Sequence, residues 1–90
     1  SRALLPDYLR RRAQDARDVA DAVAAGRYDV VSFIGGKMAD TGVAYGLPQL
    51  SEIGGKLDVA GKKREGSVVL SQLRRLQDLL AAVDESEEEA

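Results

Sequence analysis

Apolar side chains recur every three or four residues in four separate segments of this chain, and glycine or proline stands between the segments. This spacing puts the apolar residues on one face of a helix, whereas a strand requires alternation. The clearest case is the series Val69, Leu73, Leu76, Leu80 and Val83, with steps of four, three, four and three residues. The pattern predicts an all-α protein.

Prolines and glycines mark the expected helix boundaries. Pro6 and Pro48 suit first helical turns, and Gly26 and Gly42 suit helix ends, so the second helix is expected over residues 28–41. The predicted core positions of the first three helices are Leu5, Leu9, Ala13, Ala16, Ala20 and Val23, then Val30, Val31, Ile34, Met38 and Thr41, then Leu50, Ile53, Leu57 and Ala60. Short links place consecutive helices antiparallel. The predicted fold is therefore an antiparallel up-down-up-down four-helix bundle.

The charge distribution divides the chain at its C-terminal end. Five acids, Asp84, Glu85, Glu87, Glu88 and Glu89, lie within the last seven residues. We expect a bundle over residues 1–83 and a disordered acidic tail over residues 84–90. Without those five acids the net charge changes from −2 to +3, and only 4% of the residues are aromatic. This balance argues against nucleic-acid binding.

The residue inventory offers little for catalysis. The chain contains neither histidine nor cysteine, which removes imidazole bases, thiolate nucleophiles and the common zinc ligands. We therefore expect no enzymatic activity, no metal site and no cofactor. No apolar run approaches the ~20 residues that span a bilayer, and no signal peptide is visible. The absence of cysteine is compatible with a reducing compartment, and we expect a cytoplasmic protein without a membrane partner.

Two adjacent glycines interrupt the second predicted helix. Gly36 lies two residues from both Ile34 and Met38, which at about 100° per residue turns it away from the core. A solvent-facing glycine inside a helix costs about 1 kcal/mol relative to alanine. Gly35 and Gly36 together therefore call for a reason other than helix stability.

The segment around these glycines resembles the histidine-phosphotransfer (HPt) domain of bacterial phosphorelays. The resemblance is carried by Ile34-Gly35-Gly36-Lys37-Met38-Ala39-Asp40-Thr41-Gly42, followed by Ala44-Tyr45-Gly46-Leu47 and Leu50-Ser51-Ile53-Gly54. The leading Leu4-Leu5-Pro6-Tyr8-Leu9 and the turn Ala25-Gly26-Tyr28 fit the same pattern, so the resemblance covers about residues 4–83. It is specific over residues 34–54 and generic elsewhere. It implies an HPt-like bundle that takes part in two-component signalling.

The chain departs from the family at its reactive centre. The position matching the phosphoacceptor histidine is Gly36, and Ala39 stands where an assisting lysine is common. Asp40 replaces a small glycine and places a carboxylate where a phosphoryl group would approach. Phosphotransfer requires the imidazole nitrogen as nucleophile, so the chain is expected to be unable to carry phosphohistidine.

The resemblance still implies a docking surface, although the acceptor histidine is missing. In the family a receiver domain packs on the face that bears the acceptor. The corresponding partner-binding residues here are Ser32, Gly35, Gly36, Lys37, Ala39, Asp40 and Val43. We expect this face to bind the receiver domain of a response regulator, or to regulate a neighbouring signalling domain. Two alternatives remain: an HPt domain whose histidine was lost or replaced, and a structural or oligomerisation bundle. The oligomeric state is left open.

Overall fold

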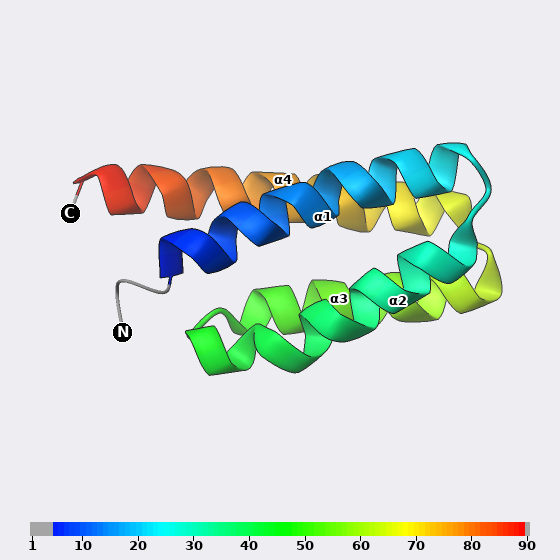
Figure 1. The fold of residues 1–90 in the computed structure, drawn as a ribbon, viewed down its shortest axis with the longest axis horizontal. Helices are drawn as coiled ribbons and strands as arrows, with labels where there is room; N and C mark the ends of the chain where they lie inside the picture. The colour runs from blue at the N-terminus through cyan, green and yellow to red at the C-terminus, as the bar shows by residue number, and fades with distance from the viewer. Residues whose placement is uncertain (1–4, 90) are drawn as a thin grey trace.

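The computed structural model describes residues 5–89, and side chains up to residue 86. Four α-helices follow one another: α1 (Leu5–Ala24), α2 (Tyr28–Thr41), α3 (Pro48–Lys63) and α4 (Gly66–Glu89). A short 3-10 helix, η1 (Val43–Tyr45), lies between α2 and α3, and residues 5–89 contain no strand. Figure 1 shows α1 beside α4 and α2 beside α3. The all-helical prediction is confirmed, whereas Leu4 of the leading motif lies outside the described residues.

The turns between helices use glycine in two different ways. Gly26 and Gly46 have φ angles of 72° and 77°, in the left-handed region that favours glycine. Gly42 instead keeps a right-handed φ of −55°. A Cβ atom on Gly42 would lie 2.5 Å from the backbone nitrogen of Ser51. A glycine is thus required at position 42 because α3 lies so close, and not because the helix ends in a left-handed conformation.

The core contains side chains from all four helices. The largest fully buried ones are Tyr8, Met38, Leu50, Ile53, Leu57, Leu76, Val19, Val31 and Val69. Burial of one such aliphatic side chain contributes about 1.5–3 kcal/mol. The predicted stripes of α2 and α3 supply most of these residues.

The predicted stripe of α1 is partly confirmed, because Ala16 is buried and three further stripe residues pack against the core. The most buried face of the helix is nevertheless rotated relative to this stripe. Tyr8, Val19 and Ala22 are buried, although the stripe omitted them. Arg12 occupies the same face and interrupts its apolar pattern in the sequence. In the structure the Arg12 guanidinium carbon lies 4.6 Å from the centroid of the Tyr8 ring, so its stem and cation cover an aromatic surface.

Helices α2 and α3 touch through their backbones. A Cβ atom on Gly54 would lie 2.5 Å from the Ala39 nitrogen, and one on Gly35 would lie 2.7 Å from the Gly54 oxygen. Near the other end of the contact, a Cβ atom on Gly61 would lie 2.8 Å from the Ser32 nitrogen. The start of α2 therefore lies against the end of α3, and side chains larger than hydrogen do not fit between them. Gly54 thus permits a close helix–helix approach.

Helix α4 continues into the acidic segment. The sequence predicted a disordered tail from residue 84, but α4 extends to Glu89, and Ala90 lies outside the described residues. Residues 84–86 are exposed. Figure 1 shows this end of α4 projecting beyond the start of α1. The helix therefore continues through residues 84–89, whereas the domain boundary at residue 83 stays a prediction.

The neighbouring glycines of α2 allow a matched test of this contact. Gly35→Ala should lower the free energy of unfolding by about 1–3 kcal/mol, because its Cβ would meet the Asp58 nitrogen at 2.6 Å. Gly36→Ala should leave it unchanged or raise it by up to ~1 kcal/mol, because its Cβ would have an ordinary 3.7 Å contact with Asp58 Oδ2. Urea denaturation of both variants measures the difference. Equal effects would contradict the proposed role of Gly35.

Candidate functional site

Some residues of the predicted partner-binding face are exposed to solvent, and others lie at the contact between α2 and α3. Lys37, Asp40 and Val43 are exposed, and Val43 exposes 66% of its surface. Ser32, Gly36 and Ala39 are half-buried. The exposed edge of the face therefore runs from the middle of α2 into η1.

Gly35 is the one predicted docking residue that the structure places in the interior. It is buried, and its backbone faces Gly54 and Leu57 of α3. At 100° per residue the two adjacent glycines point in different directions, so Gly35 faces α3 while Gly36 lies at its edge. Gly35 is therefore not available to a partner, and its role is structural.

Gly36 lies next to a small polar cluster at the edge of α3. The Asp58 carboxylate accepts a hydrogen bond from the Ser32 hydroxyl and pairs with the Lys62 ammonium at 3.4 Å. The Ser32 hydrogen bond, and secondarily the charge of Lys62, lowers the pKa of Asp58. A side chain at position 36 would touch this carboxylate. Position 36 thus has no side chain and lies beside a negative charge.

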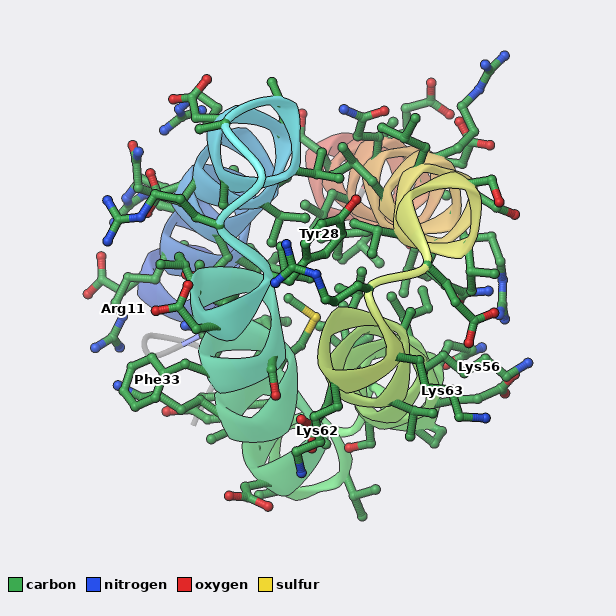
Figure 2. All side chains as sticks on the ribbon, turned by 90° about the vertical axis from the view of Figure 1, so that its right-hand side faces the viewer. Arg11, Tyr28, Phe33, Lys56, Lys62 and Lys63 are labelled. Atoms are coloured by element: carbon green, nitrogen blue, oxygen red, sulfur yellow. The ribbon has the colours of Figure 1, made fainter. Side chains whose placement is uncertain are left out.

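Phe33 is a feature of this face that the sequence prediction missed. It exposes 65% of its surface, although all three tyrosines are buried or half-buried. The Lys37 ammonium lies 5.2 Å from the centroid of its ring. Figure 2 shows Phe33 on the same side of the bundle as Arg11 of α1. The signal was available in the sequence, since Phe33 is an aromatic residue outside the apolar stripe of its helix.

An aromatic cluster anchors the end of α2 to α1. The Tyr8 and Tyr45 rings stack with centroids 3.8 Å apart, and the Tyr8 hydroxyl shares a 2.8 Å hydrogen bond with Thr41 Oγ1. Arg12 Nε lies 2.7 Å from Asp15 Oδ2 beside this stack. Burial raises the pKa of Asp15, although the charge of Arg12 opposes the shift. These contacts hold the turn after Thr41, and hence Val43, against the body of the protein.

The described residues contain no group of three acidic side chains that could hold a metal ion. Among them, no helix is both long and apolar enough to cross a membrane. No protein-family model, curated protein or solved structure matches the chain.

Removal of the Ser32 hydroxyl should raise the pKa of Asp58. Folding lowers this pKa, so the ionised carboxylate stabilises the folded state above the pKa of the unfolded chain. This contribution disappears as the pH falls through the folded value. In Ser32→Ala the Asp58 titration followed by carboxyl ¹³C NMR should move to higher pH, and the loss of stability in acid should shrink. Lys62→Met is the matched control and should have a smaller effect. An unchanged titration in Ser32→Ala would contradict the assignment.

Proposed function

We propose that this chain is an HPt-like signalling module that binds partners but transfers no phosphoryl group. In this proposal its helices form the antiparallel up-down-up-down bundle of the HPt family. It acts in the cytoplasm, where the outer face of α2 binds the receiver domain of a response regulator or regulates a neighbouring signalling domain. The proposal rests on the residue pattern of segment 34–54 together with the surface around Gly36.

The exposed aromatic ring of Phe33 is the observation that carries the binding role. The ring is 65% exposed and lies one helical turn before Gly36, which has no side chain to cover it. Aromatic side chains of this kind dominate the binding energy of protein interfaces. Lys37 and Arg11 on the same side favour a partner with acidic groups around an apolar pocket.

The absence of a nucleophile supports the loss of phosphotransfer. Gly36 has no side chain, and no histidine exists elsewhere in the chain to replace it. Asp40 is exposed one turn further along α2, and Asp58 lies beside Gly36. Both carboxylates repel an incoming phosphoryl group. Binding without transfer is the function that this combination supports best.

A titration with receiver domains tests the binding role. Amide NMR shifts should concentrate on α2 and η1, around Phe33, Lys37 and Val43. Phe33→Ala should weaken the complex at least about tenfold, because truncation of an interface aromatic commonly costs more than 1.4 kcal/mol. Leu70→Ser is the matched control, since Leu70 is 55% exposed on α4. Shifts confined to α4, or no binding to any receiver domain from the same genome, would refute the proposal.

An acceptor domain whose histidine was replaced is the second candidate. The room at position 36 favours it, because a Cβ atom there would make only an ordinary 3.7 Å contact with Asp58 Oδ2. Gly36→His should then accept phosphate from a phosphorylated receiver domain, and Asp40→Gly should increase the yield by removing a like charge. Lys37→His controls for an exposed histidine at the wrong position. A folded double variant that takes up no label would exclude this candidate.

A further inference from the structure

Gly55 is a glycine that packing within the chain does not explain. A Cβ atom on any of its counterparts Gly35, Gly42, Gly54 or Gly61 would lie within 3 Å of the facing helix. At Gly55, apart from its two chain neighbours and the nearby backbone of α3 itself, no heavy atom of the described residues lies within 4 Å of the Cβ position. A half-exposed glycine in the middle of α3 weakens that helix relative to alanine. Its presence points to a close approach from outside the chain.

Gly55 lies in an apolar groove between α3 and α4 with a volume of about 420 Å³. Val59 of α3 and Val68 of α4 line the groove and are 51% and 37% exposed. Figure 2 shows Lys56, which also lines the groove, on the side of the bundle away from Phe33. The groove is therefore a surface separate from the outer face of α2.

The edges of the groove carry charges of both signs. Glu52 pairs with Lys56 at 3.2 Å and with Arg75 of α4 at 3.3 Å, and Glu65 lines the groove from the start of α4. A strongly acidic partner would meet Glu52 and Glu65, whereas a strongly basic one would meet Lys56 and Arg75. A two-fold axis brings the same patch of two copies together, so a patch with both signs matches itself where opposite charges meet across the axis.

The geometry of α3 makes this self-complementarity specific. Glu52 lies about one turn before Gly55, and Lys56 directly follows it. If two α3 helices cross antiparallel at Gly55, Glu52 of each copy comes beside Lys56 of the other. At the same time Val59 and Val68 of both copies become covered. The missing Cβ at position 55 lets the two backbones approach, as Gly54 does within the chain at α2.

We propose that the α3–α4 groove is a homodimer interface in which the α3 helices of two copies cross at Gly55. The interface is small, so the dimer is weak and forms reversibly with concentration. The proposal does not depend on receiver binding, because it uses the other side of the bundle. A dimer of this kind would present two outer α2 faces to partners at once.

Sedimentation equilibrium of the full chain tests the dimer between about 10 µM and 1 mM, the range expected for a small interface. The mass should rise with concentration from 9.6 kDa towards twice that value. Gly55→Leu should raise the dissociation constant at least about tenfold by obstructing the crossing. Gly55→Ala should weaken the dimer less than Gly55→Leu does. In dilute solution the melting temperature of the Gly55→Ala monomer should not fall, because alanine is the better helix former. Gly36→Ala is the matched glycine control and should leave the mass profile unchanged.

A charge exchange tests the orientation of the two copies. Glu52→Lys alone and Lys56→Glu alone should each weaken self-association, because like charges then meet across the interface. An equimolar mixture of the two variants should form a heterodimer at least as stable as the original homodimer. A mass that stays at the monomer value up to 1 mM would overturn the proposal. So would a dimer that Phe33→Ala abolishes and Gly55→Leu leaves intact, or a mixture that fails to associate.

Discussion

The backbone contact between α2 and α3 is the constraint on which the rest of the structure depends. Gly35 and Gly54 face each other at its centre, with Gly42 and Gly61 towards its two ends. Since no side chain separates the helices there, Met38, Leu50 and Leu57 are free to fill the centre of the bundle. The same contact fixes the rotation of α2 about its axis. It thereby determines that Phe33 and Lys37 face solvent and that Gly36 lies at the edge of α3.

The polar groups at this edge follow from the close approach. Because α3 lies so near to α2, the Ser32 hydroxyl can donate a hydrogen bond to the Asp58 carboxylate. The same carboxylate lies beside Gly36. Position 36, which the family resemblance marks as reactive, thus has no side chain and lies beside a negative charge. The proposed loss of phosphotransfer rests on this charge and on the absent side chain. The tyrosine stack between α1 and η1 holds the far end of the same face in place.

The two exposed features of the bundle differ in their relation to the core. Phe33 is an exposed aromatic residue outside the core stripe of α2. Gly55 has no side chain, although the space around it would accept one. Neither improves the fold, since one exposes apolar surface and the other weakens a helix. Phe33 and Lys56, which lines the same groove as Gly55, lie on opposite sides of the bundle, so the two proposed contacts would not compete.

The sequence alone determined the four helices and most of their boundaries, because apolar periodicity, Pro48 and Gly26 act through local geometry. It also predicted that position 36 lies outside the core. Only the tertiary structure distinguished the buried Gly35 from the half-buried Gly36, since their different environments depend on where α3 lies. It also decided the rotation of α1, where Arg12 covers Tyr8, and the helical state of the acidic end. These features arise from contacts between residues distant in the chain. The spacing of apolar residues within a single helix does not determine such contacts.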